Sequence, residues 1–138
     1  MNTRRQFIKQ SATAGILLCC GISLDSCGSA KYIYLSGDIS KLIVRKSDFG
    51  EKKTVILKHE KFSAPIYLVK KSENDYDALL MLCTHKGCEL RPAQNYLLCP
   101  CHGSEFSNSG DVIKSPATEK LKKFETGSDD QNIYVYVK

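Results

Sequence analysis

Two short clusters of cysteine and histidine constrain this chain more than any other feature of its sequence. "CTHKGC" occupies residues 83–88 and "CPCHGS" occupies residues 99–104, so four of the seven cysteines and two of the three histidines lie in two six-residue stretches. Thiolate and imidazole are the side chains with which proteins hold iron, zinc and copper. The spacing therefore predicts two loops that meet around a common centre.

Length and charge bound the remaining interpretations. A chain of 138 residues supports a single domain with one modest core. Its formal net charge of +5 is spread along the sequence, and basic and acidic residues alternate in stretches such as "KLIVRKSDFGEKK" at 41–53. Nucleic-acid binding is not expected, because the chain shows no basic block with stacking aromatic residues around it.

The N-terminus has the layout of an export leader. Residues 1–10 carry three cationic and no acidic side chains, and residues 11–24 are uncharged. "TRRQFIK" at 3–9 resembles the twin-arginine export motif, whose route carries proteins that are already folded. We therefore predict a signal peptide over residues 1–26 and a location in the periplasm or on the outer face of a bacterial membrane. The alternative is an ordinary basic leader.

A second leader feature concerns attachment to the membrane. "LDSCGS" at 24–29 resembles a bacterial lipobox, which makes Cys27 the lipidation candidate and would anchor the mature chain by acyl chains. The alternatives are a plain secreted protein and a leader kept as a membrane anchor. Residues 27–36 are expected to form a short tether and the first strand, and residues 37–138 the folded domain.

The mature chain reads as all-β. Short runs of β-branched and aromatic residues alternate with polar turns, which favours a small antiparallel sandwich or barrel. In the last run, Ile133, Val135 and Val137 should share one face and Tyr134 and Tyr136 the other. The two cysteine clusters then fall on loops at strand ends. The expected strands are residues 32–35, 54–58, 65–71, 77–83, 96–99, 123–126 and 132–138.

The ligand types in the two clusters suggest a specific cofactor. Each loop offers one thiolate and one imidazole, so two thiolates could hold one iron and two imidazoles its neighbour, which is the ligand set of a Rieske [2Fe-2S] centre. "CTHKGC" and "CPCHGS" resemble the cluster-binding loops of the Rieske family, in its cytochrome bc-type branch. "SEFSNSGDVIKSPATEKL" at 104–121 continues the likeness, which is close over residues 80–121 and covers the expected cluster-binding subdomain.

The resemblance implies a role for each site residue. Cys83 and Cys99 would bind one iron, His85 and His102 the other, and Cys88 would form a disulfide with Cys101. Such a bond is durable in an exported protein. Three further positions would lie around the cluster: Ser104 as a hydroxyl donor to a bridging sulfide, Phe106 where other members carry a tyrosine hydroxyl, and Pro116 in the loop that closes over the cluster.

Several details depart from the family pattern. Phe106 removes one hydroxyl donor, so we expect a reduction potential below that of members with both hydroxyls and above that of members with neither. Ser115 replaces the glycine usual before Pro116. The short segment between the two loops predicts a trimmed hairpin, with Tyr96, Leu97 and Leu98 in its core. Leu90 and Pro92 are candidates to pack near the cluster tip.

Two structural alternatives compete with the cluster. Zinc also accepts two cysteines and two histidines, although its usual pair spacings differ from these. Two structural disulfides would also use all four cysteines and would leave both histidines idle. His59 has no cysteine nearby and is predicted to be a surface residue.

The chemistry points to electron transfer, with no independent catalytic site expected. The resemblance implies the iron-sulfur subunit of a membrane-associated oxidoreductase such as a quinol–cytochrome c reductase, with a membrane-bound quinol-oxidising subunit or a cytochrome as redox partner. One alternative is a stand-alone lipid-anchored carrier, or the small subunit of another exported enzyme such as an arsenite oxidase. Another is the ferredoxin of a ring-hydroxylating dioxygenase, against which the Cys88/Cys101 pair and the leader argue.

Overall fold

The computed structural model describes residues 30–137. The predicted leader, the twin-arginine motif and Cys27 lie outside these residues. Within them, no helix has the length and apolar character needed to cross a membrane. One 3-10 turn, η1 (Lys46–Asp48), accompanies the strands β1 (Lys31–Leu35), β2 (Lys41–Arg45), β3 (Thr54–His59), β4 (Ile66–Lys70), β5 (Tyr76–Leu80), β6 (Arg91–Pro92), β7 (Tyr96–Leu98), β8 (Glu105–Ser107), β9 (Val112–Lys114), β10 (Lys123–Ser128) and β11 (Asn132–Tyr136).

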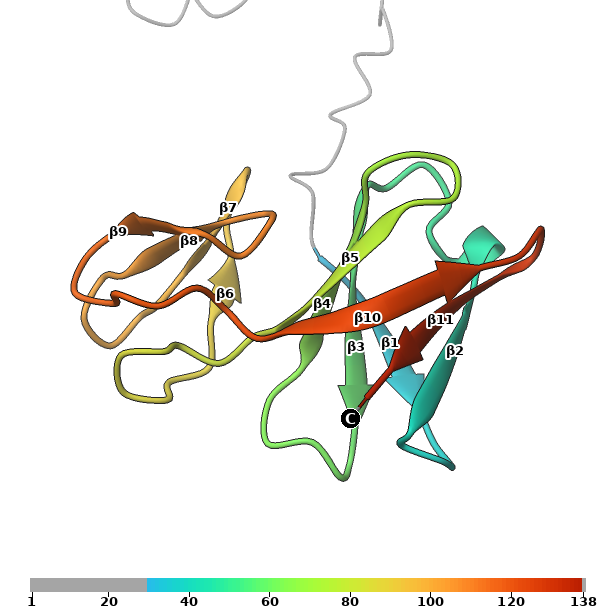
Figure 1. Ribbon diagram of the computed structural model, residues 1–138, viewed down its shortest axis with the longest axis horizontal. Helices are drawn as coiled ribbons and strands as arrows, with labels where there is room; N and C mark the ends of the chain where they lie inside the picture. The colour runs from blue at the N-terminus through green and yellow to red at the C-terminus, as the bar shows by residue number, and fades with distance from the viewer. Residues whose placement is uncertain (1–29, 138) are drawn as a thin grey trace, which may run out of the picture.

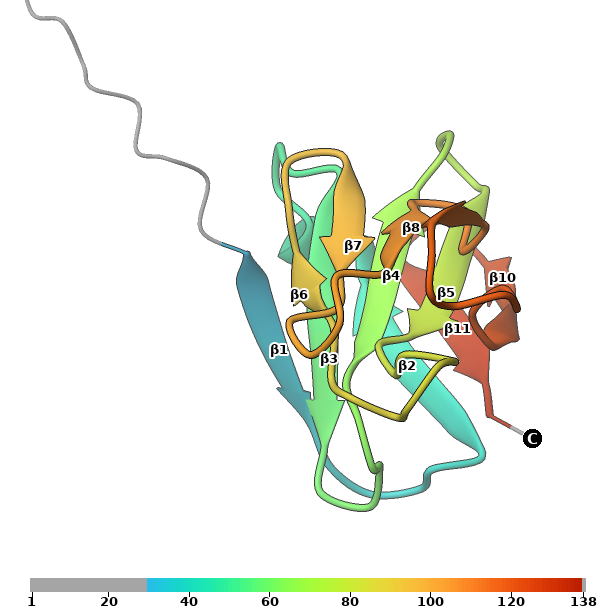
Figure 2. The same cartoon turned by 90° about the vertical axis from the view of Figure 1, so that its left-hand side faces the viewer.

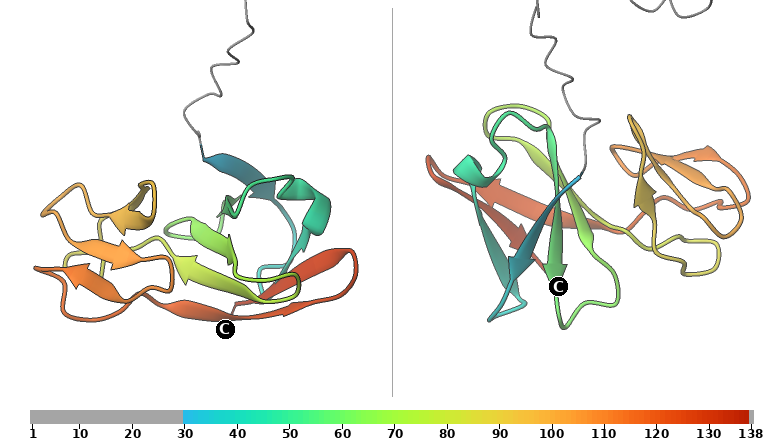
Figure 3. Two further views of the ribbon diagram at one scale, coloured as in Figure 1. Left: turned by 90° about the horizontal axis from the view of Figure 1, so that it is seen from above. Right: turned by 180° about the vertical axis from the view of Figure 1, so that it is seen from behind.

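Seven of the strands form one sheet that curls into a nearly closed barrel (Figures 1 and 3). Its order is β1-β3-β4-β5-β10-β11-β2. Alternate side chains point inward, as Leu42 and Val44 on β2 and Ile133 and Val135 on β11 show, all at most 3% exposed. The predicted alternation in the last strand is thus confirmed.

The sequence predicted an antiparallel sheet, but one pair of strands in this sheet is parallel. β1 pairs with β3 in parallel, with Lys31 opposite Val55 and Leu35 opposite His59. Between them the chain forms β2 and η1 at the far edge of the sheet, so β3 does not return to β1 through a hairpin. Every other named pair in the described residues is antiparallel.

The four remaining strands form a second sheet, β6-β7-β8-β9, which lies beside the barrel (Figures 1 and 2). We call residues 81–122 the loop subdomain, because they enter it after β5 and leave it before β10. Its strands are only two or three residues long. A separate apolar core, which includes Leu79, Leu90, Leu97 and Phe106, joins the loop subdomain to the outer face of the barrel.

All seven expected strands are observed, with shifted ends, but one residue was placed wrongly. His59 is 7% exposed, so the prediction of a surface histidine is wrong. It ends β3, its ring contacts that of Phe62 at 5.4 Å, and its Nδ1 accepts a hydrogen bond from the Lys61 N–H. In the trimmed hairpin, Leu97 is fully buried while Tyr96 and Leu98 are half-buried.

Candidate metal centre

The two cysteine clusters fold into loops with the same backbone hydrogen bonds. In the first, the Cys83 N–H donates to the Cys88 carbonyl at 2.8 Å and the Gly87 N–H to the Cys83 carbonyl at 2.8 Å. In the second, the Cys99 N–H donates to the Ser104 carbonyl at 2.8 Å and the Gly103 N–H to the Cys99 carbonyl at 3.0 Å. Each loop therefore holds a cysteine at its base.

The fifth residue of each loop is a glycine, which suits the turn that closes the loop. Gly87 has φ of +70° and Gly103 has φ of +77°, in the left-handed region that other residues rarely adopt. The histidines lie between the base cysteine and this glycine, His85 in the first loop and His102 in the second. Local backbone chemistry thus places thiols at the base of both loops and imidazoles nearer their tips.

The two thiols meet in the interior. Cys83 is 2% exposed and Cys99 1% exposed, and within residues 30–137 neither forms a disulfide. Burial acts to raise the pKa of the Cys99 thiol, but hydrogen bonds with the Cys83 side chain and with the backbone N–H groups of Cys101 and His102 together hold that pKa below its ordinary value. The same N–H groups would stabilise a metal-bound thiolate.

The two imidazoles meet on the outer side of the thiols. The ring centroids of His85 and His102 lie 5.0 Å apart, with the rings 80° from parallel. His102 is exposed, whereas His85 is partly covered and its Nδ1 is buried without a hydrogen-bond partner among the described residues. Because a buried polar atom without a partner is costly, this nitrogen fits a metal ligand.

The predicted disulfide is confirmed. Cys88 and Cys101 are bonded, with their Cα atoms 6.5 Å apart, so the bond joins the two loops covalently. This finding rules out two structural disulfides, because Cys83 and Cys99 remain free.

The arrangement of ligand atoms distinguishes a two-metal cluster from zinc. Tetrahedral zinc would bring all four ligand atoms to about 3.3–3.8 Å of one another. In the described residues, only the sulfurs of Cys88, Cys99 and Cys101 form a group of three within 4.8 Å, and two of these are already joined in the disulfide. Thiols and imidazoles instead form two separate pairs, as two iron atoms require.

The loop around Pro116 is tied to both cluster loops. Ser104 is fully buried, and its Oγ accepts a hydrogen bond from the Ala117 N–H at 3.0 Å, which leaves its own proton available for another acceptor. The Thr84 hydroxyl donates to the Glu119 carbonyl at 2.6 Å. Pro116 itself is exposed and follows a cis peptide bond. Sequence reasoning missed Thr84, since nothing local marks a contact 35 residues away.

Phe106 follows the second loop, on β8, and is fully buried. Its register partner is Leu97 on β7, and a bulge between Glu105 and Phe106 follows on the side of β9. Leu90 is 1% exposed in the same core, and Pro92 is half-buried at its margin. Both lie at the junction with the barrel, where a hollow of about 510 Å³ is lined by Ile56, Met81, Leu90 and Pro92 among others.

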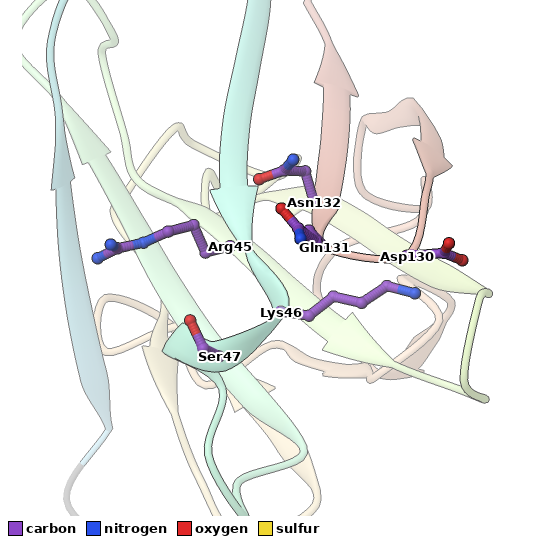
Figure 4. A pocket seen from close by; sticks show the side chains of 6 residues that line it. All are labelled: Arg45, Lys46, Ser47, Asp130, Gln131 and Asn132. Atoms are coloured by element: carbon purple, nitrogen blue, oxygen red, sulfur yellow. The ribbon is translucent and has the colours of Figure 1, made fainter.

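A second hollow, of about 330 Å³, lies at the opposite end of the barrel, between η1 and the β10–β11 hairpin (Figure 4). Its lining side chains do not converge on one point in this view. Arg45 pairs with Asp48 at 3.3 Å, and the Lys46 ammonium donates to the Asn74 side chain at 2.6 Å. Both cationic side chains that line this hollow thus already have partners, and the hollow is not part of the metal centre.

Comparison with known proteins agrees with this geometry. A family model for the Rieske [2Fe-2S] domain matches residues 38–125. The chain belongs to the Rieske [2Fe-2S] domain family. Its cofactor is accordingly a Rieske-type [2Fe-2S] cluster, and the buried thiol pair and the neighbouring imidazole pair fit that group.

The Rieske chain is similar to subunits of a membrane complex. It is 37% identical over 73 residues to the chloroplastic cytochrome b6-f complex iron-sulfur subunit of Triticum aestivum, a match that covers 50% of this chain and 33% of that one. The corresponding subunit of Prochlorococcus marinus is 36% identical over 75 residues, which is 51% of this chain and 42% of that one. The Rieske chain therefore spans well under half the length of these relatives.

Solved structures give a fuller overlap. The cyanobacterial plasma membrane Rieske protein PetC3 from Synechocystis PCC 6803 superposes with a TM-score of 0.57 at 29% identity, over 67% of this chain and 95% of that one. A chain from the complex of oxygenase and ferredoxin in carbazole 1,9a-dioxygenase superposes with a TM-score of 0.54 at 22% identity, over 72% and 94% of the two chains. The second likeness concerns the fold alone.

Proposed function

We propose that this chain transfers single electrons as the iron-sulfur subunit of a membrane-associated, quinol-oxidising complex. Cys83 and Cys99 would hold one iron and His85 and His102 the other. The observation that carries the proposal is the separation of two buried thiols from two neighbouring imidazoles, one with an unpartnered buried nitrogen. When bound, such a cluster supplies a one-electron carrier.

The surrounding residues would prepare the site for that role. The backbone N–H groups around Cys99 offset the charge of a bound thiolate. The Ser104 hydroxyl keeps a proton to donate, because its oxygen already accepts from the Ala117 N–H. His102 is exposed, so the imidazole side of the site is open to a redox partner, whereas the thiol side is covered by protein.

The proposal extends to the organisation of the whole chain. Residues 37–138 would form the Rieske domain, with residues 80–121 binding the cluster. Residues 1–26 would direct twin-arginine export, and Cys27 would carry a lipid that anchors the domain to the outer face of a bacterial membrane. A membrane-bound cytochrome is the redox partner we propose, because the similar proteins named above are iron-sulfur subunits of cytochrome b6-f complexes.

A specific observation favours a second candidate function. The structural likeness to the plasma membrane Rieske protein PetC3 extends over 95% of that solved chain, at 29% identity. A stand-alone anchored carrier, or the small subunit of another exported oxidoreductase, would agree with this likeness to a plasma membrane Rieske protein. Purification from native membranes in mild detergent separates the two: a b-type cytochrome partner supports the first function, and a molybdenum subunit or no partner the second.

The test of the cluster is low-temperature electron paramagnetic resonance before and after anaerobic dithionite reduction, with iron and zinc measured on the same sample. We expect a signal that appears only on reduction, with an average g below that of all-cysteine clusters, and about two irons per chain. His85→Ala should abolish this signal and His59→Gln, in the barrel, should leave it. Silence in both states with zinc bound would refute the proposal.

A further inference from the structure

The cysteine that would bind iron in the second loop lies against a disulfide. The sulfur atoms of Cys88, Cys99 and Cys101 are all within 4.8 Å of one another. Cys88 and Cys101 are bonded to each other, and Cys99 is a free thiol. A free thiol beside a disulfide is the starting arrangement for thiol–disulfide exchange, in which a thiolate attacks one of the two bonded sulfurs.

We propose that Cys99 is a thiol–disulfide exchange site in the chain that lacks its cluster. The Cys99 sulfur forms a bond with the Cys88 sulfur, the bond between Cys88 and Cys101 breaks, and its electron pair leaves on the Cys101 sulfur. One disulfide is made and one is lost, so the step consumes no oxidant and the number of thiols is unchanged. The inference goes beyond electron transfer and rests on the proposed function only in making Cys99 an iron ligand.

Burial decides which of the two bonded sulfurs is attacked. Cys101 is exposed, so a thiolate released there is solvated by water, whereas Cys88 is only partly exposed. Desolvation disfavours the charged form of a leaving thiol. Attack on Cys88 with departure of Cys101 is therefore the favoured direction, and its product is a Cys88–Cys99 disulfide.

Loop closure by itself provides little preference for the original pairing. Cys99 lies two residues nearer to Cys88 in sequence than Cys101 does, and loop-closure entropy changes only slowly with loop length. Because the two pairings close loops of almost equal size, a substantial share of cluster-free chains should rearrange. Iron on Cys99 removes the attacking sulfur, so the bound cluster protects the pairing that the centre needs.

The order of assembly follows from this protection. A chain that acquired the disulfide before the cluster could lose Cys99 as a ligand, whereas a chain loaded first could not. Loading before export avoids that loss, and it is the order that a twin-arginine leader provides, since that route carries folded proteins. A Cys88–Cys101 disulfide would therefore mark a molecule that received its cluster before the disulfide formed, and a Cys88–Cys99 disulfide one that did not.

The test maps disulfides in the full chain carrying Cys19→Ser, Cys20→Ser and Cys27→Ser, which removes the three thiols outside the two loops. The cluster is released in acid with a chelator, the chain is returned to mildly alkaline pH without oxygen, and samples are quenched in acid over time. Free thiols are alkylated with N-ethylmaleimide, and peptides are mapped by mass spectrometry without reduction. We expect loss of Cys88–Cys101, gain of Cys88–Cys99 and alkylation of Cys101, while the loaded protein under the same conditions keeps only Cys88–Cys101.

Two variants identify the attacking sulfur. Cys83→Ser should still rearrange, and Cys99→Ser should not. Rearrangement in Cys99→Ser, or its absence from every cluster-free sample, would overturn the proposal. A parallel sample in concentrated guanidinium chloride gives the distribution for an unfolded chain, and a native sample that matched that distribution would also count against it. Because the readout is disulfide connectivity, failure here is distinct from failure of the resonance experiment on the cluster.

Discussion

The barrel and the loop subdomain are held in shape by different interactions. The barrel has mostly five- or six-residue strands in regular register, and its core is held by alternating apolar side chains such as Leu57 and Val135. The loop subdomain has strands of two or three residues, three glycines with positive φ and a disulfide. Its loops are fixed by backbone hydrogen bonds and covalent chemistry more than by sheet pairing.

The difference shows how a small domain can combine a stable base with a precisely shaped site. Regular strands would carry alternate side chains to opposite faces and could not bring four ligands to one point. Irregular loops can, but they need ties to hold them. If the two regions are stabilised separately, substitutions in one should leave the other largely intact.

The largest expected effects come from matched core truncations. Leu57→Ala in the barrel and Leu97→Ala in the loop subdomain remove side chains that are 1% and 0% exposed. Each should lower the free energy of unfolding of its region by about 2–5 kcal/mol. We expect Leu57→Ala to lower the thermal midpoint measured by far-ultraviolet circular dichroism. On heating, Leu97→Ala should lose the visible absorbance of the cluster at a temperature at which the barrel is still folded. Equal shifts of both signals in both variants would show one cooperative unit.

Removing the disulfide should affect the loop subdomain alone. Replacing Cys88 and Cys101 by serine frees two loops whose joined positions are 13 residues apart, a loss of about 3 kcal/mol by chain-entropy reasoning. We expect less bound iron and an unchanged barrel, measured by iron content and by hydrogen exchange of β3 and β11. Faster exchange in those strands would contradict independent stabilisation.

Gly110 tests the contact between the two regions. A Cβ at this position would lie 3.0 Å from Leu79 Cδ2 on β5, and φ is +93°. Gly37 in the barrel has a similar φ of +102° with nothing within 4 Å, so it isolates the backbone effect. We expect Gly110→Ala to cost about 1–2 kcal/mol more than Gly37→Ala in denaturant unfolding. Equal losses would mean that Leu79 moves aside freely.

A smaller effect concerns the cluster rather than stability. Phe106→Tyr should raise the reduction potential, because a hydroxyl donor near a cysteine ligand stabilises the reduced, more negative cluster. Ser104→Ala should lower it for the same reason. Protein-film voltammetry measures both. An unchanged or lower potential in Phe106→Tyr would show that the buried ring does not face the cluster.

The smallest effect lies in the turn between β10 and β11. The pKa of Asp129 is lowered from 3.8 to about 2. The largest cause is the hydrogen bond from the Tyr134 hydroxyl, and the backbone N–H groups of Asn132 and Gln131 contribute less. A lowered carboxyl pKa stabilises the folded state above the unfolded value, and this contribution is lost as pH falls from about 3.8 to about 2. Asp129→Asn should flatten the dependence of the unfolding free energy on pH over that range in acid denaturation, and an unchanged dependence would show that these hydrogen bonds do not act on the carboxyl.

The barrel could be predicted where strands were long and apolar, and not elsewhere. β2 was missed although Leu42 and Val44 alternate inward, because Lys41 and Arg45 give the stretch the look of a charged surface. In the loop subdomain only β7 was predicted, and β6, β8 and β9 are too short to show any period. His59 was placed wrongly because its burial depends on Phe62 and on the neighbouring strand, which local sequence does not reveal.

The candidate site was easier to predict than much of the fold. Cysteine and histidine spacing, together with the family resemblance, predicted the loops, the disulfide and the cofactor before any geometry was available. The ties from Thr84 to Glu119 and from Ala117 to Ser104 were not predictable, because they join segments far apart in the chain. Chemistry concentrated in short motifs can be predicted from the sequence, whereas long-range contacts cannot.

The pairing of β5 with β10 has a consequence for how such proteins can change. Lys123 lies opposite Leu79 and Phe124 opposite Ala78, so the chain leaves the barrel at 81 and returns at 122 along neighbouring strands, about 5 Å apart. A segment whose two ends meet in this way can be exchanged as a cassette without altering the strand pairing of the barrel, when its apolar contacts with the outer face of the barrel are kept. Exchange of residues 81–122 for the equivalent segment of a relative would thus be a practical way to give this barrel a centre of different potential.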